Sequence, residues 1–262
     1  MPGIQLAADE LSRLVAARPK ETADVLHQLQ HPIRSEEDLL DLLGRTTHLA
    51  VELIDGADWA GVTAQFGADP FTASRTHERV QSVDDVQYAL DDGPCLRAMR
   101  QSEVVALSAT MVHQEFPELF SVAQRHDVGS FLAAPMSANG ESIGALNLYS
   151  ADEAAFESAD QGFITLLVGC ASRGLSEYAL VHSTEILEAQ LHQAILHRAP
   201  IEQAKGILMA VHQIGPDDAF TVLREESMRR NIKLRDLAVD FVADTAGQAE
   251  TASTQERATN GR

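Results

Sequence analysis

The sequence predicts an α+β protein: an N-terminal domain with a mostly antiparallel sheet flanked by helices, then a helical linker and a C-terminal three-helix bundle. Three observations indicate this fold class. Short alternating apolar runs occur between residues 59 and 149, as expected of half-buried strands. Asn139-Gly140 separates two of these runs, and this dipeptide is a strong hairpin signal. Helical periodicity dominates beyond residue 180.

Residues 1–35 are expected to form a helical extension, because apolar residues recur at helical spacing before His31-Pro32 ends the segment. A peripheral helix packed on the first domain is the simpler interpretation, and an amphipathic arm or a partner helix is the alternative. Ser35 is followed by three acidic residues, which favours the start of a second helix reaching about Leu53.

The first domain is assigned to residues 36–180. Gly93-Pro94 breaks a helical stretch between Val83 and Met99, since glycine and proline rarely continue a helix. A long apolar helix over Phe156–Tyr178 closes the domain. The other expected elements are a helix at Phe120–His126 and strands at Trp59–Phe66, Thr72–Val80, Glu103–Leu107, Ser130–Ser137 and Ser142–Tyr149.

A helical linker is expected over residues 181–200, because apolar residues seven apart run through it, as in a helix that dimerises. Pro200 is expected to kink or restart this helix. Residues 201–245 form three short helices, and the polar stretch 246–262 is expected to be disordered. The inner stripes of the three helices are Ala204, Ile207, Leu208 and Val211, then Ala219, Phe220, Leu223 and Ser227, then Leu234, Leu237, Ala238, Phe241 and Val242.

The 262 residues carry a formal net charge of −19, so the chain repels nucleic acid and anionic membranes at long range. Residues 198–245 depart from this balance with seven basic and eight acidic residues. Five of the basic residues lie between Arg224 and Arg235, which indicates a local phosphate-binding face. A solvated helix surface is the alternative, and charge alone favours it.

Composition and motifs also predict the cellular compartment and exclude several classes of metal, disulfide and catalytic site. Cys95 and Cys170 are too few for a disulfide framework or a cysteine-only zinc site. The N-terminus lacks the order of a signal peptide, and no apolar run approaches the ~20 residues of a membrane span. The ten histidines lack metal-ligand spacing, and nucleotide-binding and hydrolase motifs are missing. We expect a cytoplasmic protein that is not an enzyme, without a metal, an evident cofactor or a membrane partner.

Three ordered blocks stand in the C-terminal bundle: IEQAKGILM at 201–209, AFTVLREES at 219–227 and NIKLRDLA at 231–238. They resemble the ANTAR domain, the RNA-binding output module of bacterial transcription antiterminators. The resemblance implies a homodimer that binds paired RNA hairpins in leader transcripts and prevents a terminator from forming. This resemblance favours an RNA-binding face over the solvated helix surface that charge alone favours. The candidate RNA contacts that it implies are Lys205, Gly206, Arg224, Ser227, Asn231, Lys233 and Arg235.

Three further motifs lie in the first domain: DGADWAGV at 55–62, GPCL at 93–96 and IGALNLYS at 143–150. They resemble the GAF domain, and GAF followed by ANTAR is an actinobacterial arrangement. The resemblance implies a sensory domain, often with a small ligand held between sheet and loops. The identity of such a ligand is unknown from the sequence.

Two other functions stay open. Cys95 follows Gly93-Pro94 at an expected helix start, where the helix N-terminus can acidify a thiol, although Asp91 and Asp92 oppose this. If this thiol is reactive, the protein is a thiol redox enzyme or sensor. A packed cysteine is the simpler interpretation. A DNA-binding transcription regulator is the third interpretation, since three short helices can mimic a helix-turn-helix, but the charge density is low for duplex binding.

Overall fold

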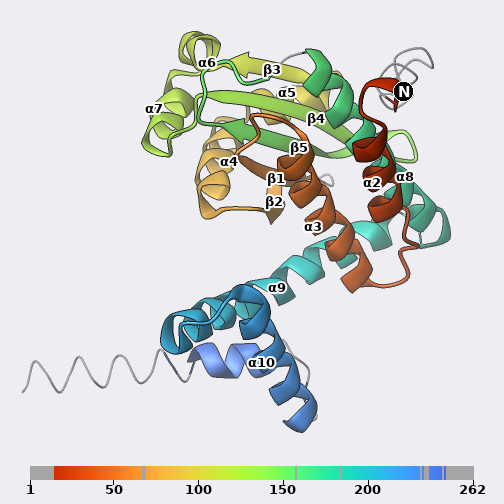
Figure 1. The fold of residues 1–262 in the computed structure, drawn as a ribbon, viewed down its shortest axis with the longest axis vertical. Coiled ribbons are helices and arrows are strands. Elements are labelled where there is room, and N and C mark those ends of the chain that lie inside the picture. Colours follow the sequence, from red (N-terminus) through yellow and green to blue (C-terminus); the bar gives the residue numbers. More distant parts are fainter. Residues whose placement is uncertain are drawn as a thin grey trace, which may run out of the picture. The chain divides into compact units, whose positions relative to one another are not determined.

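The computed structural model describes residues 15–65, 69–156, 158–182, 184–230, 232, 236–243 and 245. It divides the chain into two compact units, Met1–Leu191 and His192–Arg262. The first unit holds the sheet and its helices, and the second holds the helices that follow (Figure 1). No helix among the described residues is long and apolar enough to cross a membrane.

A five-stranded antiparallel sheet forms the centre of the first unit, as predicted. Its spatial order is β2-β1-β5-β4-β3, and every neighbouring pair is antiparallel. The central pair joins β1 to β5, with Trp59 opposite Tyr149 and Ala64 opposite Gly144. The strands are β1 (Trp59–Ala64), β2 (Phe71–Arg75), β3 (Val105–Ser108), β4 (Ser130–Ala138) and β5 (Glu141–Ser150).

The predicted Asn-Gly hairpin joins β4 to β5. Asn139 has φ 51° and Gly140 has φ 82°, and both positive values fit the two-residue turn that matches the twist of paired strands. The flanking residues Ala138 and Glu141 are paired directly. The turn therefore sets the register of the first two residue pairs, and a bulge between Met136 and Ser137 shifts the register beyond them.

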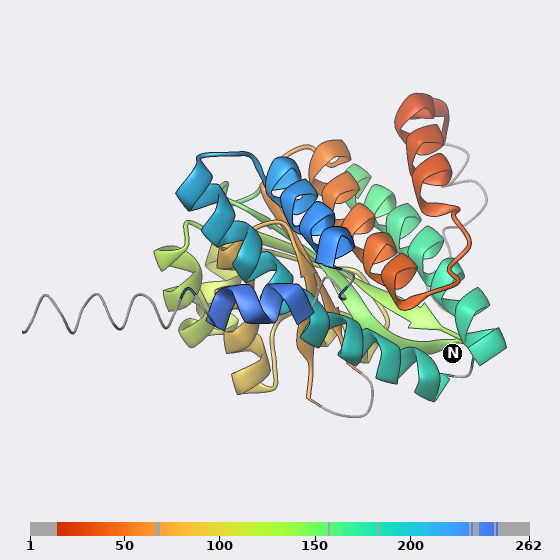
Figure 2. The same cartoon turned by 90° about the horizontal axis from the view of Figure 1, so that it is seen from below.

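Two helical layers cover the sheet. α3 (Glu36–Leu53) and α8 (Ser158–His182) lie on one face, where Leu43 and Leu175 meet Val62 and Met136 around a small gap. Figure 2 shows these two helices side by side. α2 (Pro19–Leu29) packs on both. The opposite face carries α4 (Glu78–Leu90) and α5 (Pro94–Gln101), where Cys95 packs with Ala145 of β5.

Local capping explains several helix boundaries. Ser35 and Asp38 form a capping box at the start of α3, which confirms the predicted start. The break at Gly93-Pro94 is also confirmed, because α4 ends at Leu90 and α5 begins at Pro94. The described part of the predicted N-terminal helical segment is helical over residues 15–17 and in α2, and residues 4–14 lie outside the described residues.

One strand expected in the first unit is wrong at its end, and one helix was not predicted. The strand predicted over Thr72–Val80 ends at Arg75, because the His77 side chain accepts a hydrogen bond from the Arg79 amide and starts α4. A helix that the sequence did not predict, α6 (Ala109–Glu115), follows β3, where the Ser108 side chain caps the Met111 amide. α7 (Pro117–Arg125) lies where a helix at Phe120–His126 was expected.

The second unit contains the end of α9 (Thr184–His212), then α10 (Pro216–Arg230) and a helix over residues 236–243. Its core consists of Ala204, Leu208, Ala219, Leu223, Leu237 and Ala238. α9 continues through Pro200, so the helix does not restart there. A proline inside a helix removes one backbone hydrogen bond and crowds the carbonyl four residues earlier, yet α9 is helical on both sides of Pro200. The polar stretch 246–262 lies outside the described residues.

The inner stripe of α9 is shorter than predicted. Val211 is 68% exposed and does not belong to the core, because α9 ends at His212 and the chain turns away through Gln213, which has φ 53°. Phe220 has no described side chain, and Leu234 lies outside the described residues, so their predicted core positions stay predictions.

Gly144 supplies a test of the β1–β5 pairing. A Cβ atom there would lie 2.1 Å from the backbone oxygen of Thr63, so Gly144→Ala forces the two central strands apart. We expect the free energy of unfolding to fall by about 1–3 kcal/mol, measured from urea unfolding. Gly169→Ala on α8 is the matched control, since nothing lies within 4 Å of the added atom; it should gain about 0.5–1 kcal/mol. Equal midpoints for the two variants would contradict this account.

Candidate functional site

Lys205, the first candidate RNA contact, lies on α9 beside an acidic partner. Its Nζ atom is 3.1 Å and 3.0 Å from the two carboxylate oxygens of Glu202, one turn earlier. The side chain is only 18% exposed. Lys205 is therefore held along the helix by an internal carboxylate, and a phosphate that binds it has to compete with Glu202.

Gly206 and Ser227 differ in what they present to a bound RNA. A Cβ atom on Gly206 would meet nothing within 4 Å, so packing within the chain does not require a glycine and the helix surface is open to an external strand. The Ser227 hydroxyl donates to the Ile232 carbonyl oxygen at 2.7 Å. This bond satisfies a carbonyl beyond the end of α10, and it leaves the hydroxyl as an acceptor for an RNA group.

The other four candidates stay predictions. Arg224 lies within α10, but its side chain is not described. Asn231, Lys233 and Arg235 lie outside the described residues. The structure thus places Lys205, Gly206 and Ser227 on α9 and α10, and a single surface formed by all seven candidate residues stays a prediction.

Two basic residues outside the candidate set are already paired. Arg229 and Arg230 both bind the carboxylate of Glu226, one turn earlier on α10. Hydrogen bonds from Arg229 and then Arg230 lower the pKa of Glu226 to about 2. Arg230 also lines a groove of about 250 Å³ with Val222, Leu237 and Phe241.

Cys95 lies at the start of α5 and is 1% exposed. Its amide donates to Gln87 Oε1 at 3.0 Å, and its Sγ is 3.1 Å from Thr63 Oγ1. Burial, and then the nearby Asp84 carboxyl, raise the pKa of the Cys95 thiol to about 12. A thiol with such a pKa is a poor nucleophile at neutral pH, so the geometry favours a packed cysteine over the redox alternative.

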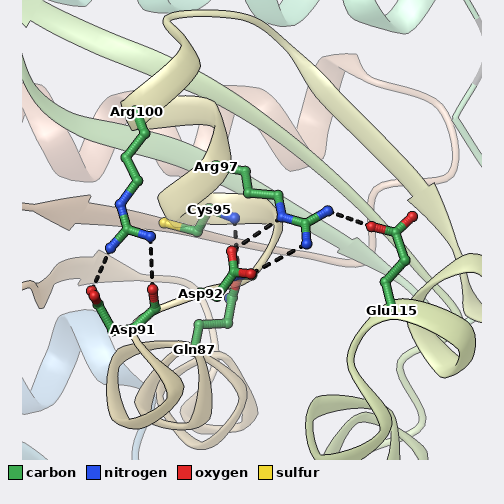
Figure 3. A network of polar contacts seen from close by, with 8 residues as sticks. Gln87, Asp91, Asp92, Cys95, Arg97, Arg100 and Glu115 are labelled. Atoms are coloured by element: carbon green, nitrogen blue, oxygen red, sulfur yellow. Dashed lines mark hydrogen bonds and ion pairs between the residues drawn. The ribbon is translucent and has the colours of Figure 1, made fainter.

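An ion-paired clasp made by Arg97 and Arg100 surrounds the start of α5 at Cys95 (Figure 3). Arg97 binds Asp92 through Nε at 3.1 Å and Nη2 at 3.2 Å, and it also binds Glu115 of α6. Its guanidinium carbon lies 4.2 Å from the centre of the Phe116 ring. Arg100 binds Asp91 in the same turn. These contacts tie the turn between α4 and α5 to α6.

Beneath the clasp lies a buried polar cluster that sequence analysis missed. Asp84 is 0% exposed, and it accepts hydrogen bonds from Tyr149, from Thr72 at 2.9 Å and from Gln87 at 3.3 Å. Desolvation raises the pKa of the Asp84 carboxyl to about 7 despite these donors.

His77, His113 and His126 have separate partners. His77 caps α4, and the ring of His113 lies 4.5 Å from that of Phe120. The carbonyl oxygen of His126 accepts from Arg79 at 2.9 Å. Within the described part of the chain no group of three metal-ligating side chains occurs.

Comparisons with known proteins agree with the two-part architecture. A GAF domain model matches residues 36–176, and an ANTAR domain model matches residues 189–242. The curated proteins compared with the chain include no match. The chain therefore belongs to the GAF domain family. It is a regulatory protein in which a GAF domain precedes an ANTAR domain, and ANTAR domains bind RNA.

Solved structures similar to the chain include two free methionine-R-sulfoxide reductases. The Thermoplasma acidophilum enzyme is 19% identical, with 56% of this chain and 97% of that chain covered and a TM-score of 0.46. The Neisseria meningitidis enzyme is 15% identical, with 68% and 98% covered and a TM-score of 0.44. The GAF domain of an Acinetobacter phosphoenolpyruvate-protein phosphotransferase is 12% identical, with 63% and 95% covered and a TM-score of 0.43. These similarities do not assign an activity to this chain.

The burial of Cys95 generates a test of the thiol alternative. Cys170→Ala leaves Cys95 as the remaining thiol. We expect its reaction with Ellman's reagent at pH 8 to be at least about 100-fold slower in the folded protein than in urea, because modification has to wait for local or global opening. A folded-state rate close to that of the unfolded chain would restore the redox interpretation. Cys95→Ser in the same background checks that the signal comes from Cys95.

Proposed function

We propose that this protein is an RNA-binding transcription antitermination regulator whose GAF domain receives a signal. It acts as a homodimer on paired RNA hairpins in leader transcripts. The observation that carries the proposal is the ANTAR match over residues 189–242, a segment that folds around its own apolar core. Its place of action is the cytoplasm, where nascent transcripts are made.

The charge distribution supports a small, shaped target. A chain with a net charge of −19 is repelled by a long duplex, so affinity has to come from a few close contacts. Unpaired loop bases offer such contacts, because arginine can stack on them and polar side chains can bind their edges. Hairpin loops therefore suit this surface better than a uniform helix does.

Each candidate residue has a role that its chemistry allows. Lys205 exchanges the Glu202 carboxylate for a phosphate, and Arg224, Lys233 and Arg235 bind phosphates or stack on bases. Ser227 accepts a hydrogen bond, and Asn231 reads a base edge. The open helix surface at Gly206 admits the RNA backbone.

Pairing of two bundles matches pairing of two hairpins. Leu180 is the first of the apolar residues that recur seven apart (Leu180, Leu187, Ala194, Ile201 and Leu208). It is 77% exposed on α8, whereas Leu187 and Leu208 are buried within the chain. A leucine in a repeat of this period is suited to a second helix. Two bundles linked in this way raise the effective concentration of the second contact once the first hairpin is bound.

The RNA proposal is tested by recovering cellular RNA with the wild type and with Lys205→Ala/Arg224→Ala. We expect the wild type to enrich leader RNAs with tandem hairpins and the double variant to lose them. On one enriched RNA, fluorescence anisotropy should show affinity falling by about 100-fold, since two charged contacts are removed.

The matched control is Arg229→Ala/Arg230→Ala, which removes the same charge from the same bundle, where both arginines are held by Glu226. It should keep most of the affinity, and circular dichroism should show both variants folded. Equal losses in the two variants would mean that charge alone binds RNA. Recovery of no RNA, or of duplex DNA instead, would refute the proposal.

The dimer is tested by sedimentation at micromolar concentration. We expect the wild type to sediment as a dimer, and Leu180→Asp to raise its dissociation constant by at least about 10-fold, because burying a leucine contributes roughly 1.5–3 kcal/mol. Met111→Asp, at a leucine-sized side chain that is 43% exposed on α6, is the control and should leave the dimer intact. A wild-type monomer would contradict the paired-hairpin mechanism.

A further inference from the structure

A continuous chain of hydrogen bonds runs through the interior of the GAF domain. Asp84 Oδ2 lies 2.9 Å from Thr72 Oγ1, which lies 3.0 Å from Tyr88 Oη. Tyr88 Oη lies 2.8 Å from Thr63 Oγ1, which lies 3.1 Å from Cys95 Sγ. We call these side chains the relay: Asp84, Thr72, Tyr88, Thr63 and Cys95. It joins α4, β2, β1 and α5.

The middle of the relay can run in either direction. Each hydroxyl of Thr72, Tyr88 and Thr63 has one proton to donate and lone pairs to accept, so each can donate to either neighbour. The direction is therefore set at the ends. One end is a carboxyl, which is acceptor-only when ionised and gains a donor when protonated.

With Asp84 ionised, every hydrogen bond points toward it. Thr72 donates to the carboxylate, Tyr88 donates to Thr72, and Thr63 donates to Tyr88. The Cys95 thiol and the Asn147 side-chain amide, 2.9 Å from Thr63 Oγ1, then both donate to Thr63. Protonation lets Asp84 donate to Thr72 and turns the three hydroxyls around.

At the Cys95 end of the relay, this reversal costs little free energy. Thr63 then has to donate to Cys95 Sγ, and the S–H bond rotates away. A thiol is a weak donor and a weak acceptor, so neither arrangement leaves a strong group unpaired there. Asn147 continues to donate to Thr63 in both arrangements, because Thr63 accepts two bonds.

We propose that Asp84 is a proton-binding site whose occupancy reverses the relay, so that the GAF domain reports pH as a change in the hydrogen bonding of Cys95. The proton comes from solvent and returns to it. The inference that the proton is the signal of the regulator rests on the proposed sensory function, whereas proton binding by Asp84 does not.

The surroundings of Asp84 favour the neutral form. The carboxyl is 0% exposed, and this desolvation outweighs the hydrogen bonds donated by Tyr149, Thr72 and Gln87, which favour the ionised form. Among the described residues the charged and titratable groups that act on it are Asp85 and Tyr88 of α4, Arg75 of β2, Tyr149 of β5 and Cys95 of α5. Arg75 favours ionisation from a distance while it binds Glu78.

The balance of these groups places the change near neutral pH. Desolvation, the largest cause, brings the pKa of Asp84 to about 7 from an ordinary value of 3.8. Because the folded state binds this proton more tightly than the unfolded state does, the contribution of Asp84 to stability is fully present below pH ~4 and is lost as pH rises toward 7. Asp84 thus couples folding energetics and relay direction to the same proton.

The test uses the full chain without RNA, in the Cys170→Ala background. The carbon-13 NMR signal of the Asp84 carboxyl is assigned with Asp84→Asn and followed from pH 4 to 9. The Raman S–H stretching band of Cys95 is followed over the same range. We expect both to change with one midpoint near pH 7, and the band to stay fixed in Asp84→Asn.

Two further variants separate the relay from general loosening of the fold. Thr72→Val breaks the chain next to Asp84 without removing the carboxyl, so Asp84 should still titrate while the Cys95 band no longer moves. Asp85→Asn removes the exposed neighbouring carboxyl and should keep both transitions. An Asp84 midpoint below pH 5, or a Cys95 band that ignores the Asp84 transition, would overturn the proposal whether or not the protein binds RNA.

Discussion

The packing of α4 and α5 on the sheet depends on one buried carboxyl group, that of Asp84. Asp84 accepts hydrogen bonds from β2 through Thr72 and from β5 through Tyr149. Gln87, one turn along α4, donates to the same carboxyl and accepts from the Cys95 amide, which anchors α5. A buried polar group is tolerated when its partners are all in place and is strongly destabilising when they are not. The cluster therefore specifies one arrangement of α4 and α5 on the sheet.

Much of the sheet domain could be predicted because its strongest signals are local. Asn139-Gly140 and the capping box at Ser35 each determine the backbone within a few residues. The errors arose where one side chain overrides the pattern. His77 caps α4 and cuts short a strand that its apolar alternation would have continued, and Ser108 starts a helix of only seven residues. Single hydrogen bonds of this kind leave little trace in apolar periodicity.

The candidate sites differ in how far sequence could predict them. The candidate RNA contacts followed from a resemblance, and the structure adds what those residues do without RNA: Lys205 binds Glu202, and Ser227 binds a carbonyl oxygen. The Asp84 cluster could not be predicted. Its members come from α4, β2 and β5, and the relay that extends from it adds residues of β1 and α5. Single polar residues in a strand are usually taken to face solvent. Their convergence requires the register of β1 against β5, which tertiary structure alone supplies.

The pairing of Lys205 with Glu202 has a thermodynamic consequence for any anion that binds there. A free lysine on a surface releases salt ions from a nucleic acid when it neutralises a phosphate, so its affinity falls steeply as salt is added. Lys205 already carries its own counterion, and that counterion cannot diffuse away. A phosphate that takes its place leaves a carboxylate behind, to be neutralised by cations from solution. Binding at this position is then less sensitive to salt than the number of contacts implies, because the chain itself supplies one of the exchanging ions.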